Sequence, residues 1–214
     1  MRSTRFAAAL VPALCLCLLV LCLAGQARAA ASPSDSLRAS VDQVLLILKN
    51  PDYADKAKRP PLRAEIERIV RSIFDFTEFS RRTIGTYWSG FKPDQQKRFS
   101  DAFAELLLST YLDKVHGYSG EGVVYLGERF TQNNRLAEVQ TTLALTAGQP
   151  TPVAYRMILK DNAWRIYDVL VENVGLNSNY RVQFNEILAK SPPDELIRRV
   201  EERVKELRQQ DADS

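Results

Sequence analysis

The sequence contains few of the residues that build catalytic and metal sites. Its 214 residues include a single histidine, His116, and three cysteines, Cys15, Cys17 and Cys22, all within the first 29 positions. The chain from residue 30 onward therefore has no thiol for a disulfide, and His116 has no second histidine or cysteine to join it at a zinc site or in a triad. No glycine-rich phosphate loop is present either. The sequence predicts no metal and no cofactor, and offers little for catalysis.

An excess of positive charge is also missing once the first 29 residues are set aside. The full chain has 29 lysines and arginines against 26 aspartates and glutamates, and three of the arginines, Arg2, Arg5 and Arg28, lie in that segment. Residues 30–214 therefore carry 26 basic against 26 acidic side chains, since 29 minus 3 is 26. A nucleic-acid-binding protein needs a clustered basic surface, so we expect no nucleic-acid partner.

Residues 1–29 have the pattern of a secretory signal peptide. Two arginines precede an uncharged stretch from Phe6 to Leu23, and the segment ends in Ala27-Arg28-Ala29, the small-x-small pattern of a cleavage site. An uncleaved membrane anchor is the alternative, because the 18 uncharged residues reach the lower limit for spanning a bilayer. We predict cleavage and export of residues 30–214 as a single domain.

Beyond residue 30 the hydrophobic period is that of helices, then of strands, then of helices again. The first helix is expected to have Ser34 or Ser36 as its cap. Spacings of three or four predict helices, and spacings of two predict strands. The helices are expected at 37–48, 60–73, 74–79 and 93 to about 116, and the strands at 123–130, 136–146, 153–160 and 164–174. After a break at Gly175 and Asn177, C-terminal helices are expected from Tyr180 and from Asp194.

This order of elements predicts an α+β fold. It has a helical N-terminal half, a curved four-stranded antiparallel sheet in an NTF2-like arrangement, and C-terminal helices. An apolar pocket between sheet and helices is one of two interiors that the spacing permits. Periodicity alone leaves open a core that is simply well filled, because a filled core and a ligand-lined one show the same spacing.

A two-residue hairpin loop at Asp161-Asn162 would set the register of the last two strands. The expected pairs are Leu159 with Trp164, Met157 with Ile166, Tyr155 with Asp168, and Val153 with Leu170. One face of this hairpin would then be apolar except for Asp168. The other face would carry Arg156, Lys160, Arg165 and Tyr167.

Asp168 has two interpretations. It is either a structural carboxylate that hydrogen-bonds to Tyr155 or Arg181, or the general base of an NTF2-like enzyme that acts on a small apolar substrate. In the second case burial would raise its pKa, and Tyr155 or Tyr167 would assist it. We prefer the structural interpretation, and the enzyme is the alternative function.

Three segments carry a resemblance to a known family. They are FDFTEFSRRTIGTYW (74–88), PDQQKRFSDAFAELLLSTYL (93–112) and WRIYDVLVENVGLNSNYRVQFNEIL (164–188). Together they resemble the MlaC family, the periplasmic phospholipid-binding component of the Mla lipid transport system, also called the toluene-tolerance auxiliary family. The resemblance extends from Leu37 to Leu207. The chain departs from the family at Asn173-Val174-Gly175, where a Gly-Val-Ser turn is usual.

The resemblance implies a periplasmic carrier that maintains outer-membrane lipid asymmetry. Phospholipid would be its cargo rather than a cofactor. Its partners would be an outer-membrane lipoprotein complex and an inner-membrane ABC transporter with its substrate-binding subunit. We expect the sheet wall of the lipid pocket to comprise Leu143, Val153, Tyr155, Met157, Ile166 and Leu170, and the helical side Leu107, Tyr111, Val174, Tyr180 and Phe184.

Overall fold

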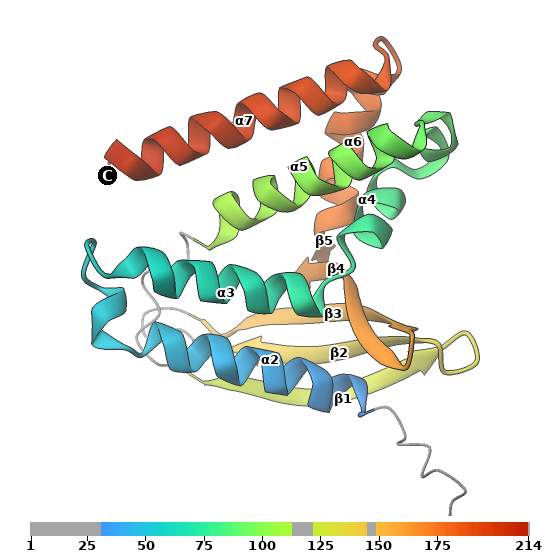
Figure 1. Ribbon diagram of the computed structural model, residues 1–214. Coiled ribbons are helices and arrows are strands. Elements are labelled where there is room, and N and C mark those ends of the chain that lie inside the picture. Colours follow the sequence, from blue (N-terminus) through green and yellow to red (C-terminus); the bar gives the residue numbers. More distant parts are fainter. Residues whose placement is uncertain (1–30, 113–121, 145–148, 214) are drawn as a thin grey trace, which may run out of the picture. The chain divides into compact units, whose positions relative to one another are not determined.

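The computed structural model describes residues 31–112, 122–144 and 149–213, which contain six α-helices and a five-stranded antiparallel sheet (Figure 1). The helices are α2 (Pro33–Leu48), α3 (Arg59–Ile73), α4 (Phe76–Ile84), α5 (Pro93–Tyr111), α6 (Leu176–Leu188) and α7 (Pro193–Asp213), with 3-10 turns at Pro51–Tyr53 and Gly85–Gly90. The strands are β1 (Val123–Thr131), β2 (Leu136–Leu143), β3 (Thr151–Lys160), β4 (Ala163–Val171) and β5 (Val174–Gly175). The predicted α+β class is confirmed. The predicted signal peptide, His116 and the predicted end of the second strand at 145–146 lie outside the described residues.

Helices α2 and α4 begin at short polar side chains that cap free N–H groups of the first turn. Ser32 caps α2 by accepting a hydrogen bond of 3.0 Å from the Asp35 N–H, so the prediction of Ser34 or Ser36 as the cap was wrong. Asp75 caps α4 by accepting from the Glu78 N–H at 2.9 Å. Prolines occupy the first turns of α2, α3 and α5, where their missing N–H would have had no partner in any case.

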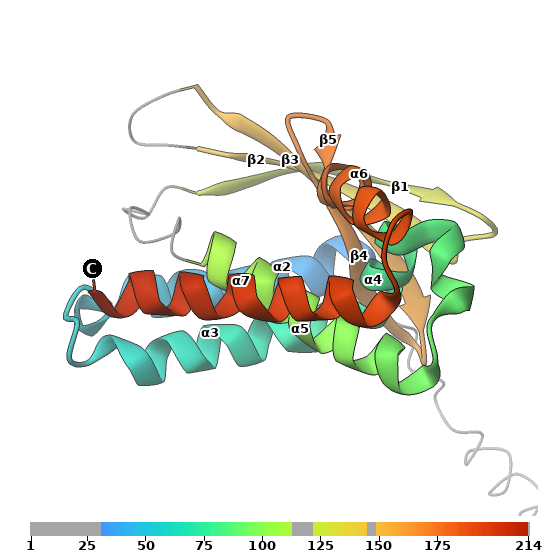
Figure 2. The same ribbon diagram turned by 90° about the horizontal axis from the view of Figure 1, so that it is seen from above.

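The helices are arranged around the sheet in two groups. In the first, α2 lies against β1 and β2, α3 runs beside α2, and α5 runs beside α7 (Figures 1 and 2). In the second, α4 and α6 pack against each other and against β4. A small apolar cluster with Tyr53, Ile66 and Leu108 at its centre connects α2, α3 and α5. The helical layer therefore holds the sheet on one face and at its β4 edge.

The sheet has one more strand than predicted. The order is β1-β2-β3-β4-β5, with every neighbouring pair antiparallel. The predicted strand from Trp164 to Val174 is wrong, because β4 ends at Val171 and Glu172 and Asn173 turn the chain with φ angles of 50° and 66°. Positive φ at both central residues is the geometry of a type I′ hairpin turn. Val174 then pairs back onto Val171.

A β-bulge changes the register that we predicted for β3 and β4. The Asp161-Asn162 loop and the pairs Leu159–Trp164 and Met157–Ile166 are confirmed. Beyond them the register shifts, so the pairs are Arg156–Asp168, Tyr155–Val169 and Val153–Val171 rather than the predicted ones. One extra residue in a strand moves every later side chain to the other face. Asp168 and Leu170 therefore lie on the face opposite to Tyr155 and Val153.

Candidate functional site

The face of the sheet that α2 covers, called the inner face here, consists of cross-strand rows of side chains. Side chains that pair across antiparallel strands lie on the same face. One row contains Ala137, Met157 and Ile166, and the next contains Val139, Tyr155 and Val169. The third contains Tyr125, Thr141, Val153 and Val171, and the fourth contains Val123, Leu143 and Thr151.

Coverage of the inner face is complete in the first row and incomplete in each of the others, although Thr141 and Val153 of the third row are buried. The first row is fully buried, with Met157 at 0% exposure, and packs with Leu37 of α2 and Ile73 of α3. Tyr155 and Leu143 in the later rows are only partly buried. Val171 and its partner Val174 are exposed, Val174 at 61%. An apolar sheet face with incompletely covered side chains can accept an apolar ligand at those positions.

The predicted sheet wall is largely on the inner face. Leu143, Val153, Tyr155, Met157 and Ile166 share that face in the order just described. Leu170 is buried but lies on the opposite face, because the bulge precedes it. Sequence reasoning did not select Tyr125 or Thr141, although the alternation in their strands carried the signal.

The predicted helical side lies in a different apolar cluster from the sheet wall. Phe103 of α5 is the centre of this helical cluster, with ring centroids 5.0 Å from Tyr180 and 5.1 Å from Phe184. Leu107 and Tyr111 belong to the same cluster, which contains none of the predicted sheet-wall residues. Val174 is exposed on β5. The structure therefore does not bring the two predicted walls together around one hollow.

Two surface pockets lie outside the inner face. A pocket of about 370 Å³ at the start of α4 is lined by residues of α3, α4, α5 and the β3–β4 hairpin, among them Arg71, Phe76, Ser100 and Lys160. A second, of about 360 Å³, lies between α5, α6 and α7 and includes Tyr180 and Phe184. Both volumes are near the lower end of the range for small-molecule sites, ~300–1,000 Å³. Neither includes a residue of the predicted sheet wall.

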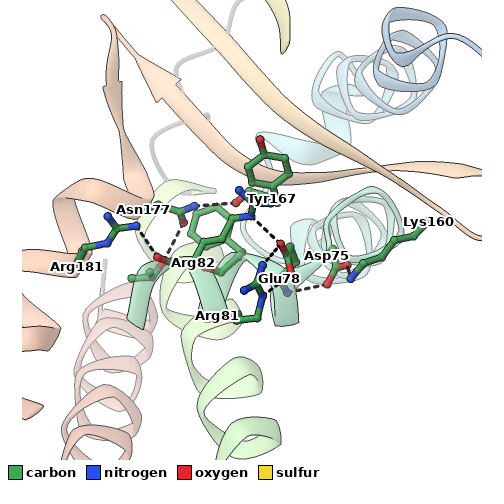
Figure 3. A network of polar contacts seen from close by, with 10 residues as sticks. Asp75, Glu78, Arg81, Arg82, Lys160, Tyr167, Asn177 and Arg181 are labelled. Atoms are coloured by element: carbon green, nitrogen blue, oxygen red, sulfur yellow. Dashed lines mark hydrogen bonds and ion pairs between the residues drawn. The ribbon is translucent and has the colours of Figure 1, made fainter. Parts of the chain in front are cut away.

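A polar network fixes α4 to β4 and α6 (Figure 3). Glu78 accepts hydrogen bonds from Arg81 at 2.8 and 2.7 Å and from Arg82 at 2.7 Å, and the Arg82 guanidinium lies 3.9 Å from the centre of the Tyr167 ring. The Asn177 side chain donates to the Tyr167 carbonyl at 3.0 Å. Tyr167 is the extra residue of the bulge, so α4 and α6 both hold the bulged segment in place.

Further contacts extend the network at both ends. Thr83 donates to the Asn177 side chain at 2.9 Å, and Arg181 donates to the Arg82 carbonyl at 2.6 Å. Lys160 of β3 forms an ion pair with Asp75, the cap of α4. Helix α4, which contains most of the FDFTEFSRR motif, is thereby bonded both to the sheet and to α6, which contains the NYRVQF motif.

Asp168 is a buried structural carboxylate. It is 3% exposed and accepts hydrogen bonds from the Asn177 N–H at 3.1 Å and from Arg156 at 3.4 Å. Burial raises its pKa, while the Asn177 N–H and Arg156 act in the opposite direction. The carboxylate is hydrogen-bonded, as the structural interpretation expects, but the predicted partners, Tyr155 and Arg181, were wrong. Asp168 also lies off the inner face, which removes the argument for a general base in an apolar pocket.

Asp168 also explains why residue 175 is a glycine. Gly175 ends the Asn173-Val174-Gly175 segment, where the chain differs from the Gly-Val-Ser turn that is usual in the family. A Cβ at Gly175 would lie 3.1 Å from an Asp168 carboxylate oxygen, closer than a side chain and a fixed carboxylate normally approach. Gly175 itself has an ordinary extended backbone as the N-cap of α6. The glycine is therefore needed for the close approach of β5 to Asp168, and the positive-φ turn is made by Glu172 and Asn173.

We expect Glu78→Gln to destabilise the protein at neutral pH. Hydrogen bonds from Arg81, opposed by burial and assisted by Arg82, lower the pKa of Glu78 from its usual 4.5 to about 2. Because the folded-state pKa is lower than that of the unfolded chain, the stabilisation is complete above about pH 4.5 and is lost as the pH falls through 2. The expected loss is on the order of 2 kcal/mol at pH 7 and close to zero near pH 2, measured by urea unfolding at both pH values.

The control is Glu186→Gln. Glu186 faces Lys190 at 3.9 Å, and both side chains are about three-quarters exposed, so the pair contributes little. A loss for Glu78→Gln that stays constant from pH 7 to pH 2 would show that the carboxylate charge is not the source of its stabilisation.

The described residues set further limits on the site. They include no group of three or more histidine, cysteine, aspartate or glutamate side chains that could hold a metal ion. Among the same residues, no helix is both long and apolar enough to cross a membrane.

A partly covered apolar sheet face backed by helices is typical of an α+β protein that binds apolar ligands. Comparison with known proteins identifies the family. The chain belongs to the MlaC protein family, whose model matches residues 38–202. This is nearly the extent over which the sequence motifs resemble that family.

Two curated relatives and one solved structure are similar to the chain. The toluene tolerance protein Ttg2D of Pseudomonas putida is 22% identical over 167 residues, covering 78% of this chain and 77% of the relative. The intermembrane phospholipid transport system binding protein MlaC of Haemophilus influenzae is 20% identical over 152 residues, covering 69% and 71%. The phospholipid-binding protein of Ralstonia solanacearum, solved in complex with a phospholipid, has a TM-score of 0.69 at 25% identity and covers 83% of this chain and 99% of its own.

Proposed function

We propose that this protein is a periplasmic phospholipid carrier that shields acyl chains against the inner face of its sheet. The observation that carries the proposal is the incomplete cover of the later rows, where apolar Leu143 and Tyr155 are only partly buried. The similar Ralstonia solanacearum protein binds a phospholipid in a related fold, which supports the same cargo here.

The energetics of lipid transfer explain why a carrier is needed. Two acyl chains carry about thirty CH₂ groups, and exposing them to water at ~0.8 kcal/mol each costs on the order of 20 kcal/mol. A phospholipid therefore cannot cross an aqueous compartment at a useful rate alone. A carrier must cover the tails, leave the head group near the opening, and release the lipid on contact with a partner.

The lipid wall that we propose contains fewer residues than the sequence analysis predicted. It comprises Leu143, Val153 and Tyr155 on the inner face. Leu107 and Tyr111 of α5 belong to the helical cluster and are left out of it. Met157 and Ile166 form its packed base. Leu170 lies behind the sheet and Val174 at its exposed edge, while Tyr180 and Phe184 support α5 from the helical cluster.

The proposed carrier exchanges lipid between an outer-membrane lipoprotein complex and an inner-membrane ABC transporter with its substrate-binding subunit. Membership of the MlaC family, and the relative named as part of an intermembrane phospholipid transport system, support this proposed role. It requires cleavage of the predicted signal peptide at residues 1–29 and export of the remaining chain.

Lipid content tests the proposal directly. We expect native mass spectrometry of the purified protein to show a mass addition of one phospholipid, which organic extraction recovers as an intact glycerophospholipid. Protein freed of lipid should take up fluorescent phospholipid from vesicles in a saturable manner. A delipidated, folded protein that takes up no phospholipid at any vesicle concentration would refute the carrier.

A further inference from the structure

Tyr125 places a polar atom without a protein partner on the apolar inner face. Its hydroxyl oxygen is buried and makes no hydrogen bond within the described part of the chain. The ring is held by the Arg38 guanidinium, 3.9 Å from its centre, and packs against the same cluster as Met157 and Ile166. A buried hydroxyl without a hydrogen-bond partner is destabilising, so each such group calls for an explanation, and a ligand that accepts its hydrogen bond is one.

The neighbours of Tyr125 leave its hydroxyl free to donate. Tyr125 pairs with Thr141, whose hydroxyl donates to the Val153 carbonyl at 2.9 Å. Tyr155 belongs to the adjacent row and hydrogen-bonds with Thr141. Burial raises the pKa of both Tyr125 and Tyr155 to about 12, and for Tyr125 the nearby Tyr155 adds to the shift. Both phenols therefore keep their protons at neutral pH.

The position of Tyr125 on the inner face matches one part of a lipid. Its row lies beyond the fully packed row of Met157 and itself ends at the exposed Val171, which pairs with Val174. In a diacyl phospholipid the ester carbonyls lie at the boundary between the apolar tails and the polar head group. An ester carbonyl oxygen accepts hydrogen bonds and cannot donate them, which is what a phenol donor in an apolar wall requires.

We propose that Tyr125 is a specificity-determining residue that donates a hydrogen bond to an ester carbonyl of the bound lipid. This inference rests on the carrier function proposed above. It assigns the cargo to ester-linked glycerolipids. A lipid with ether-linked chains has the same tails and head group but no carbonyl, so it would leave the Tyr125 hydroxyl unpaired in the complex.

The experiment uses delipidated protein and two forms of phosphatidylglycerol with equal chain length, one diacyl and one dialkyl-ether. The affinity for each lipid is measured by equilibrium competition against a fluorescent lipid. We expect the wild-type protein to bind the diacyl lipid about tenfold more tightly, and Tyr125→Phe to remove most of that difference by weakening the diacyl lipid alone. Tyr87→Phe, at an exposed position in the turn after α4, is the matched control and should change neither affinity.

The outcomes separate this inference from the carrier function. Equal binding of both lipids to the wild-type protein would overturn the ester contact while leaving the carrier intact, and this arm does not depend on how the variant folds. An equal weakening of both lipids by Tyr125→Phe would place the contact on the head-group phosphate and also overturn it. Failure of both lipids to bind wild-type protein would refute the carrier itself.

Discussion

Leu143→Trp should abolish phospholipid uptake while leaving the protein folded. Leu143 lies in the least covered row of the inner face and is only partly buried, so an indole there extends into the space proposed for the acyl chains. The indole at position 143 does not have to displace tightly packed core side chains. We expect vesicle uptake to fall at least tenfold and the free energy of unfolding to change by about 1 kcal/mol or less.

Two further variants on the sheet sharpen this test. Val124→Trp is the matched control, because Val124 is 53% exposed and pairs with Thr142, so it adjoins Leu143 in the sheet but points to the opposite face. It should leave uptake unchanged. Met157→Trp inserts the same side chain into the fully packed row and should destabilise the fold by ~1–3 kcal/mol. Normal uptake by a folded Leu143→Trp protein would mean that the inner face is not the lipid wall.

Phe103→Ala should cause the largest loss of stability among the substitutions considered. Phe103 is fully buried, and its ring is within 5.6 Å, centre to centre, of Phe79, Phe99, Tyr180 and Phe184. Its removal leaves a cavity at the contact of α4, α5 and α6 that rigid neighbouring rings cannot fill. The expected cost is ~3–5 kcal/mol, measured by urea unfolding at pH 7.

The control for Phe103→Ala is Val182→Ala on the solvent side of α6. Val182 is 72% exposed and should change the unfolding free energy by less than ~0.5 kcal/mol. A loss below about 1 kcal/mol for Phe103→Ala would indicate that the helical cluster is loosely packed. In that case the helical cluster, rather than the inner face, would be the place to look for bound lipid.

The polar network in Figure 3 connects the helical cluster with the sheet. Glu78 and Arg82 on α4 and Asn177 on α6 hold the bulge at Tyr167, and the bulge decides which β4 side chains face α2. The segments that carry the family resemblance thus supply the contacts that determine the register of the inner face. Within these segments, Glu78, Arg82 and Asn177 position β4 in the sheet.

Local features were predictable because they depend on residues close together in the chain. Helical spacing and proline placement located α3 and the start of α5, and the Asp161-Asn162 turn set the first two pairs of the β3–β4 hairpin. The order of helices and strands also indicated the α+β class. The motifs in 74–88, 93–112 and 164–188 were sufficient to indicate the MlaC family, which the family match confirms.

The arrangement of the candidate site was not accessible to the same reasoning. The bulge at Tyr167 moves Asp168 and Leu170 to the other face, and it forms because α4 and α6 hold that residue through contacts distant in sequence. The division of the predicted pocket residues into two clusters has a similar cause, since α7 and α4 draw α5 into a helical core. By itself the sequence determined most of the elements, the class and the family. Only the tertiary structure decided which side chains share a face and how far each is covered, because register and burial depend on long-range packing that periodicity does not encode.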